Sequence, residues 1–340
     1  MDRKTTKLVE SANFARYRPG QKEGHYESYF LRANHPEKPE AFWIRYTIFS
    51  PHGAPGSAIG ELWAVYFDGA TGENRAVKKE VPIASCLFDH EGFKVVIDDA
   101  ILDAGKLQGS ASSDGSVIGW DLEYGGYERP LFLLAPKLYG AKLPKAKALV
   151  GLPLAAFNGE LTVDGRRIPI RNWIGSQNHN WGSKHTDDYA WGQVAGFDDD
   201  TGSFFEVGTA RLKIGPVWTP YMTLMVLRHR GEEHALNTIG RSLRASGAFD
   251  YFQWEFASEN EAVAVSGSIA ASLEDFVGLN YYNPPGGIKH CLNTKIASCR
   301  LSVKYKKGKT AGSIEVLETA SRAAFEILTD ARDHGVKILA

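Results

Sequence analysis

Short runs of apolar and aromatic residues, separated by turn dipeptides, dominate the hydrophobic pattern of this chain. Residues 42–49 (FWIRYTIF) and 61–67 (ELWAVYF) are rich in the β-branched and aromatic residues that favour strands. The second run stops at Asp68-Gly69, a hairpin-type turn signal. Similar runs recur at intervals of about 8–12 residues, which predicts an antiparallel β-sandwich or β-barrel.

Further dipeptides indicate tight turns between strands: Asp114-Gly115, Asn158-Gly159, Asp164-Gly165 and Arg230-Gly231. The chain also contains 35 glycines. Twisted sheets and tight turns both use glycine, because it has no Cβ atom to restrict the backbone. We therefore expect an all-β protein.

One late segment departs from this pattern. Between about Ile314 and His334, apolar residues recur at intervals of three and four, the period of one helix face: Leu317, Ala320, Ala324, Leu328 and Ala331. Gly335 stands where such a helix would end. The pattern predicts an amphipathic C-terminal helix that packs on the second of two sheets.

The length of 340 residues exceeds what one hydrophobic core usually fills, and it predicts two domains. The segment from Lys137 to Lys147 is basic, contains proline and shows no periodicity, which is typical of a linker. We therefore place an N-terminal β domain at residues 1–150. A C-terminal one, with the terminal helix, follows at residues 151–340.

A weak internal similarity links the two halves. Residues 26–33 (YESYFLRA) precede a polar turn and an aromatic strand, and residues 189–196 (YAWGQVAG) precede the turn Asp198-Asp199-Asp200 and Phe204-Phe205-Glu206. Two copies of such a pattern are compatible with a duplicated barrel and equally with coincidence.

The formal net charge of -1 argues against a nucleic-acid partner, which requires a strong basic excess. Lysine is densest at residues 304–309 (KYKKGK). We interpret that cluster as a solvated hairpin tip, with a phosphate or membrane patch as the alternative.

Three cysteines without a CxxC pair indicate a reducing compartment. Residues 1–7 (MDRKTTK) lead into no apolar region of the kind found in signal peptides. No window approaches the roughly 20 apolar residues that a membrane helix needs. We expect a cytoplasmic protein without an integral membrane segment.

Residues 175–182 (GSQNHNWG) contain the first candidate catalytic group. The imidazole of His179 exchanges protons near neutral pH, and the neighbouring amides, including Asn178, are suited to orienting it. Trp181 lies on the same face of a strand as His179, and its ring can stabilise a developing cation. The alternative is that His179 and Trp181 form a hydrogen-bonded core pair.

Glu206 is the second candidate, because it is a carboxyl group within the apolar run Phe204-Phe205-Glu206-Val207. Burial raises the pKa of a carboxyl group, so a buried Glu206 retains a proton that it can donate to a carbon–carbon double bond. If Glu206 points to solvent instead, it is only the polar member of an alternating strand.

Several aromatic residues are candidates for lining a substrate pocket. Tyr189 and Trp191 follow the His179 segment. Tyr281 and Tyr282 lie in an Asn-, Pro- and Gly-rich loop, and Trp218 and Tyr221 lie near Pro220. Loops of this composition also occur without a functional role.

No pattern in the sequence indicates a metal or a cofactor. His179 and His185 are six residues apart, and His229 and His234 are five apart, spacings that match neither HExxH nor a familiar zinc site. The sequence also has no Walker loop, dinucleotide fingerprint or GxSxG element. We therefore expect neither metal nor cofactor.

The element His179-Asn180-Trp181-Gly182 resembles the H-N-W-G signature of the carotenoid 1,2-hydratase (hydroxyneurosporene synthase) superfamily. That group also includes lipocalin-like Diels–Alderases and kievitone-hydratase-like proteins. Residues 157–161 (FNGEL), Gly175 and residues 26–30 (YESYF) add to the similarity, which is patchy but spans most of the chain.

This resemblance implies two tandem lipocalin-like β-barrels that bind a hydrophobic substrate in or between them. It also implies catalytic roles for His179 and Trp181, and for Phe204 with Glu206 as the aromatic–x–acid pair. The family has a Tyr and an Asp in that pair, and it has an acid where this chain has Asn178.

The leading functional hypothesis is a cofactor-independent hydratase, isomerase or cyclase for an apolar isoprenoid or polyketide-like substrate. Glu206 would protonate the alkene, Trp181 would stabilise the cation, and His179 would accept or relay the proton. The alternative is a non-catalytic carrier of a lipid or terpenoid, because a carrier needs only the apolar pocket.

Overall fold

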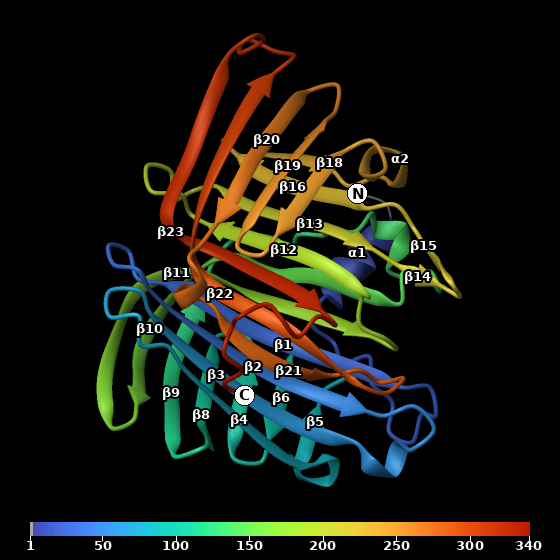
Figure 1. The fold of residues 1–340 in the computed structure, drawn as a ribbon, viewed down its shortest axis with the longest axis vertical. Helices are drawn as coiled ribbons and strands as arrows, with labels where there is room; N and C mark the ends of the chain where they lie inside the picture. The colour runs from blue at the N-terminus through green and yellow to red at the C-terminus, as the bar shows by residue number, and fades with distance from the viewer. Residues whose placement is uncertain (1–2) are drawn as a thin grey trace.

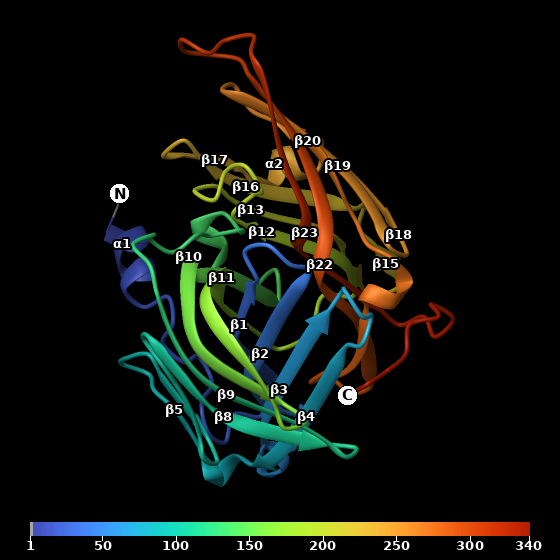
Figure 2. The same cartoon turned by 90° about the vertical axis from the view of Figure 1, so that its left-hand side faces the viewer.

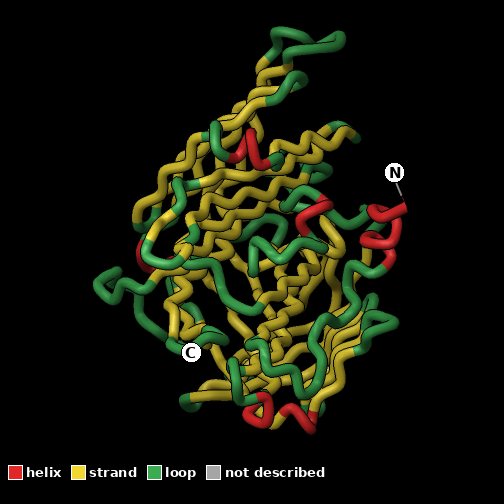
Figure 3. Tube along the Cα trace, turned by 90° about the vertical axis from the view of Figure 1, so that its right-hand side faces the viewer, coloured by secondary structure: helices red, strands yellow, loops and turns green. Residues whose placement is uncertain are grey.

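The structure is a computed structural model that describes residues 3–340, and antiparallel strands make up most of it (Figures 1 and 3). The all-β prediction is confirmed. Within the described residues, the α-helices are α1 (Arg3–Glu10) and α2 (Ile239–Ser242). Single-turn 3-10 helices lie at Pro55–Ser57, Ile83–Ser85, Pro136–Leu138 and Leu273–Asp275. None of these helices is long and apolar enough to cross a membrane.

The first sheet has 11 strands in the order β4-β3-β2-β1-β11-β10-β9-β8-β7-β6-β5. Their bounds are β1 (His25–Asn34), β2 (Glu40–Ser50), β3 (Ile59–Asp68), β4 (Arg75–Pro82), β5 (Cys86–Phe88), β6 (Lys94–Ile97), β7 (Ala100–Asp103), β8 (Lys106–Ser113), β9 (Ser116–Gly125), β10 (Ala146–Val163) and β11 (Arg166–Gly182). The sheet curls into a nearly closed barrel (Figure 2). Across the barrel, Lys78 of β4 donates its backbone N–H to Ser113 Oγ of β8 at 3.1 Å.

The second sheet has 10 strands in the order β17-β16-β13-β12-β23-β22-β20-β19-β18, with β21 paired to β22. Their bounds are β12 (Asp188–Ala195), β13 (Phe204–Arg211), β16 (Met222–His229), β17 (Glu232–Leu236), β18 (Ser246–Asp250), β19 (Gln253–Glu259), β20 (Val263–Ala270), β21 (Val277–Tyr282), β22 (Ile288–Tyr305) and β23 (Ile314–Thr329). A separate small ribbon joins β14 (Lys213–Ile214) to β15 (Val217–Trp218).

The two sheets share a topology. In each, a series of adjacent strands meets a long hairpin, β10–β11 in the first sheet and β22–β23 in the second. The two similar sequence segments fall in β1 and β12, which pair with β11 and β23 respectively. They therefore occupy equivalent positions in the two sheets.

The sheets pack against each other through the outer face of the first barrel. Along β1, the side chains of Tyr29, Leu31 and Ala33 point into the barrel core. Phe30 points outward and joins a second apolar cluster, which contains Trp43 and the second-sheet residue Tyr281. Because side chains alternate along a strand, β1 is buried on both faces.

The tight turns predicted at Asp114-Gly115, Asp164-Gly165 and Arg230-Gly231 are confirmed, whereas Asp68-Gly69 opens a longer loop between β3 and β4. Asp164 and Gly165 have φ values of 48° and 83°, and Arg230 and Gly231 have values of 54° and 75°. Positive φ at both central positions is the geometry of the tight hairpin turn that such dipeptides favour. Gly159, in contrast, lies inside β10 at a shift of register, so Asn158-Gly159 marks a bulge and not a turn.

The predicted C-terminal helix is wrong, because residues 314–329 form strand β23. Residues 323–328 (AAFEIL) of this strand are all buried and five of the six are apolar, which conceals the two-residue alternation. A largely apolar run of this kind is compatible with either structure when only its period is considered. Pairing with β12 and β22 decides in favour of a strand.

The change from the first sheet to the second occurs at residues 183–187, between β11 and β12. The boundary predicted near residue 150 therefore falls within β10, a strand of the first sheet. The lysine cluster at residues 304–309 lies where β22 ends and β23 begins, so its interpretation as a hairpin tip is confirmed.

Candidate active site

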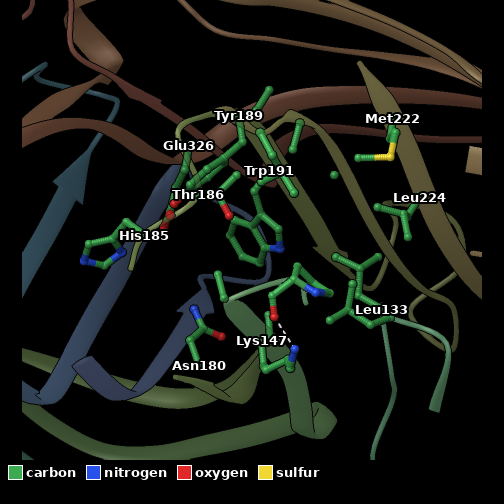
Figure 4. Close-up of a pocket in the computed structure, with 18 of the residues that line it drawn as sticks. Leu133, Lys147, Asn180, His185, Thr186, Tyr189, Trp191, Met222, Leu224 and Glu326 are labelled. Carbon is green, nitrogen blue, oxygen red and sulfur yellow. Dashed lines mark hydrogen bonds between the residues drawn. The ribbon is translucent and has the colours of Figure 1, made fainter. Parts of the chain in front are cut away.

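A cavity of about 350 Å³ lies between the two sheets, within the size range of small-molecule sites (Figure 4). Strands β1, β2, β10 and β11 line it from one side, and β12, β13, β16, β21 and β23 line it from the other. Leu138, Leu143 and Pro144 complete the wall from the irregular segment that the sequence predicted to be a linker.

The cavity has a polar end and an apolar end. Figure 4 shows His185, Thr186 and Glu326 at one end and Leu133, Leu224 and Met222 at the other, with the indole of Trp191 between them. This arrangement suits an elongated ligand that is mostly apolar and carries polar atoms at one end.

Trp191 is held in the wall by Glu206. The indole N–H donates to Glu206 Oε1 at 3.0 Å, and Glu206 Oε2 is buried without a hydrogen-bond partner among the described residues. Burial raises the pKa of Glu206 to about 7, although the Trp191 hydrogen bond and the charge of Arg32 oppose this change. Glu206 itself does not line the cavity.

Glu326 brings a carboxylate into the cavity wall. It lies directly opposite Trp191 in the β12–β23 ladder, so the two side chains are neighbours on one face. Lys295 and Asn293 donate to Glu326 Oε1 at 2.7 Å and 3.1 Å. The Cys291 thiol donates a weak hydrogen bond to Oε2 at 3.9 Å. Strong donors therefore fix one carboxylate oxygen, whereas only a weak donor holds the other.

Three basic side chains also line the cavity. Lys147 is buried, which lowers its pKa, and its Nζ donates to the carbonyl oxygen of Pro144. Burial lowers the pKa of His185 to about 3, so its imidazole is neutral, and it stacks on Tyr26 with ring centroids 3.9 Å apart. The third is Arg45, whose Nε donates to Ser28 Oγ at 2.8 Å.

His179 lies on the other side of β1 and β11, away from this cavity. Its Nδ1–H donates to the carbonyl oxygen of Ala12 at 2.7 Å, and its Nε2 lies 2.8 Å from Glu27 Oε1. Both ring nitrogens face acceptors at hydrogen-bond distance, so neither is left for a substrate. His179 and Glu27 have no solvent exposure.

Glu27 is the centre of a saturated hydrogen-bond network. Its carboxylate accepts hydrogen bonds from the backbone N–H groups of Arg16 and Tyr17 and from the hydroxyl of Tyr29, and it contacts a ring nitrogen of His25. Burial opposes ionisation of Glu27, but the hydrogen bonds from His179 and His25 outweigh it and hold its pKa well below the ordinary value.

The predicted pairing of His179 with Trp181 is present, with ring centroids 4.7 Å apart. Both side chains share a face of β11, but it is the face turned from the cavity. Asn178 is on the cavity side of β11 yet is occupied by a buried amide network: it donates to Ser176 Oγ at 2.9 Å and accepts from Gln193 at 2.8 Å.

The other predicted substrate-binding residues fall into two groups. Tyr189, Trp191 and Tyr281 line the cavity. Phe204 is packed in a small apolar cluster with no access to it, and Tyr282 lines a narrow crevice behind Arg45. Trp218 and Tyr221 are each 39% exposed and stack on Arg211 outside the cavity.

Three charged residues of the cavity wall are not among the site residues predicted from the sequence: Arg45, Lys147 and Glu326. All three lie within apolar strand segments, the same signal that singled out Glu206. Within residues 3–340, no group of three or more His, Cys, Asp or Glu side chains is arranged to hold a metal ion.

Three solved structures share this fold over nearly their whole length. An AttH-like protein from Nitrosomonas europaea is 13% identical, with a TM-score of 0.56 over 90% of this chain and 92% of its own. Kievitone hydratase from Nectria haematococca is 11% identical, with a TM-score of 0.59 over 95% and 92%. CghA is 10% identical, with a TM-score of 0.51 over 94% of each chain. No protein-family model and no curated protein matches the sequence.

Proposed function

We propose that this protein is an acid–base enzyme that adds water to, isomerises or cyclises an apolar unsaturated small molecule in the cavity between its sheets. The observation that carries the proposal is the carboxylate of Glu326 in an apolar wall beside Trp191. A carboxylate in such a setting transfers protons without competition from bulk water. Isoprenoid and polyketide-like molecules are the substrate classes that suit the apolar end.

Glu326 is the proton-transfer group in this proposal. As a water oxygen bonds to one alkene carbon, Glu326 accepts a proton from that water. The π electron pair then takes the proton back from Glu326 at the second carbon. The product is the substrate plus water. Side chains and water suffice for these steps, which need no oxidant or reductant.

Two of the three residues predicted to be catalytic, Glu206 and His179, act in this proposal by positioning other groups. Glu206 orients the indole of Trp191, and the indole forms the apolar wall beside Glu326 and the reacting carbons. His179, with Glu27, fixes β1 against β11 behind the cavity wall. Both are positioning residues. Trp181 packs beside His179 and has no part in the chemistry.

The fold comparison supports the proposal at the level of architecture. Kievitone hydratase, by its name, adds water to an organic small molecule, and it has this fold. An enzyme of this class is therefore compatible with two packed β-sheets that enclose a cavity.

Incubation in D₂O with a panel of isoprenoid alkenes and polyketide-derived enones tests the proposal. We expect a hydrated or isomeric product with deuterium on carbon, detected by mass spectrometry. Glu326→Gln should slow its formation about 100-fold or more while ligand binding persists. Glu318→Gln, an exposed carboxylate on the same strand, is the matched control.

Unchanged turnover by Glu326→Gln would remove Glu326 from the mechanism. Binding of panel members by the wild-type protein without any product would instead identify a carrier of apolar molecules.

A further inference from the structure

Arg45 is a buried cation that the protein leaves partly unbonded. The residue is 5% exposed and lines the cavity. Its Nε donates to Ser28 Oγ, but its two terminal nitrogens make no hydrogen bond with any of residues 3–340. The N–H groups on those nitrogens are the part of the guanidinium that binds carboxylates in a bidentate manner.

Aromatic rings hold the guanidinium in place. Its Cζ lies 4.3 Å from the ring centroid of Tyr281, and 5.8 Å and 5.9 Å from the centroids of Trp43 and Trp63. Rings at these distances attract the cation through their faces and restrict its motion. The guanidinium is therefore oriented before any ligand arrives.

The carboxylates nearest to Arg45 are already paired with lysines. Glu61 lies 2.7 Å from Lys78 Nζ, and Glu326 lies 2.7 Å from Lys295 Nζ. Glu80, which also contacts Lys78, is 39% exposed. No carboxylate of residues 3–340 forms an ion pair with Arg45 itself. Burial opposes the charge of Arg45, but Tyr281, Glu61 and Glu326 outweigh it and raise the pKa of the guanidinium. Arg45 is therefore a cation whose terminal N–H groups are open to a ligand in the cavity.

We propose that the ligand of this cavity carries a planar anionic oxygen head, a carboxylate or an acidic enol, that binds Arg45 in a bidentate manner. The inference deepens the proposed function and rests on the same cavity. The polar end near Glu326 and His185 receives the head, and the tail extends past Trp191 toward Leu133 and Met222 (Figure 4). The substrate class is thus an amphipathic acid and not a neutral hydrocarbon.

The first test compares two probes with the same tail, one with a charged head and one with a neutral head. Decanoate and methyl decanoate are titrated against the wild-type protein at pH 7, and binding is followed by tryptophan fluorescence. We expect decanoate to bind about 30-fold more tightly than the ester. A third probe, 2-decanoyl-1,3-cyclohexanedione, presents an acidic enol, and its affinity relative to decanoate identifies which of the two heads the site prefers.

The second test uses variants. Arg45→Gln should remove the preference for decanoate over its ester and leave ester affinity unchanged. Arg211→Gln is the matched control, because Arg211 also stacks on two aromatic rings but lies outside the cavity. Lys147→Gln removes the other cation of the wall, whose Nζ already donates to Pro144, and should keep most of the preference.

Equal binding of decanoate and its ester by the wild-type protein would overturn the inference without any variant, even if Arg45→Gln fails to fold. So would loss of the preference in Lys147→Gln but not in Arg45→Gln. If neutral alkenes of the D₂O panel are converted while neither acid binds, the proposed function survives and the anionic head is overturned. If the acids bind at Arg45 and no member of the panel is converted, the anionic head survives and the proposed function is overturned.

Discussion

The two faces of strand β1 carry polar groups in opposite states. On one face, His25, Glu27 and Tyr29 form a network with His179 in which each polar group has a partner. On the other face, Ser28 supports Arg45, whose terminal nitrogens have no partner among residues 3–340. The two sets are only one residue apart in sequence and both are buried.

This difference separates a structural role from a functional one. A buried polar network whose members are all satisfied stabilises one conformation and leaves nothing for a ligand to bind. Buried groups with open hydrogen-bond positions beside a cavity are costly unless something else completes them. Two carboxyl groups follow the same division: the pKa of Glu27 is lowered by its partners, whereas that of Glu206, with one oxygen unpaired, is raised by burial.

The largest expected effect is at the face of β1 on which every polar group has a hydrogen-bond partner. His179→Ala removes the partner of a fully buried carboxylate, so we expect the free energy of unfolding to fall by about 3–5 kcal/mol, measured by urea denaturation at pH 7. Asn180→Ala is the matched control: it is the next residue, faces the cavity, makes no side-chain hydrogen bond within residues 3–340 and should cost less than about 1 kcal/mol. Similar losses for both variants would contradict the division between the faces.

Glu206→Gln tests a buried carboxyl group that has one oxygen without a hydrogen-bond partner. The pKa of Glu206 is raised to about 7, so folding favours its protonated form. Its contribution to stability is complete below about pH 4.5 and is lost as pH rises to about 7, at about 1.4 kcal/mol per pH unit. The glutamine variant should therefore gain up to about 3 kcal/mol relative to wild type between pH 4.5 and pH 8. A constant difference across this range would show that Glu206 ionises normally.

His185 gives a dependence of the opposite sign. Its pKa is lowered to about 3, so the folded protein keeps this imidazole neutral while the unfolded chain protonates it below about pH 6.5. Stability should fall with decreasing pH, by about 2 kcal/mol between pH 7 and pH 5. His185→Asn should lose this component of the slope when thermal unfolding is followed at both pH values. An identical slope in the variant would place the titration elsewhere.

The smallest effect concerns the support of Arg45. Ser28→Ala removes the acceptor of its Nε–H, and we expect decanoate affinity to fall about 5- to 10-fold, equivalent to about 1 kcal/mol. Thr47→Val is the control, because Thr47 lies opposite Ser28 in the β1–β2 ladder and its hydroxyl has no partner. Equal effects of the two substitutions on affinity would show that Ser28 does not position Arg45.

The sequence predicted the parts of the fold whose physics is local. The segments 42–49 and 61–67 lie within β2 and β3, and the dipeptides at 114, 164 and 230 form hairpin turns, since both depend on the residues themselves. The segment 314–334 did not follow its apparent helical period. There, contacts with β12 and β22, distant in sequence, decided the structure.

The candidate site was predictable in part for a related reason. The alternation of side chains placed His179 and Trp181 correctly on one face of a strand. It did not indicate which face meets a cavity, because β1 and β11 are buried on both sides in this region. Arg45, Lys147 and Glu326 converge on the cavity from three strands, and only the packing of the two sheets brings them together.

The cavity has walls from both sheets, and this has a consequence for how the molecule responds to its ligand. A bound molecule bridges the sheets, so separating them requires its release. Ligand binding should therefore raise the unfolding temperature of both halves together, as mass action requires for a ligand that only the assembled state holds. Ligand binding and the association of the two sheets are thus thermodynamically coupled, and each stabilises the other.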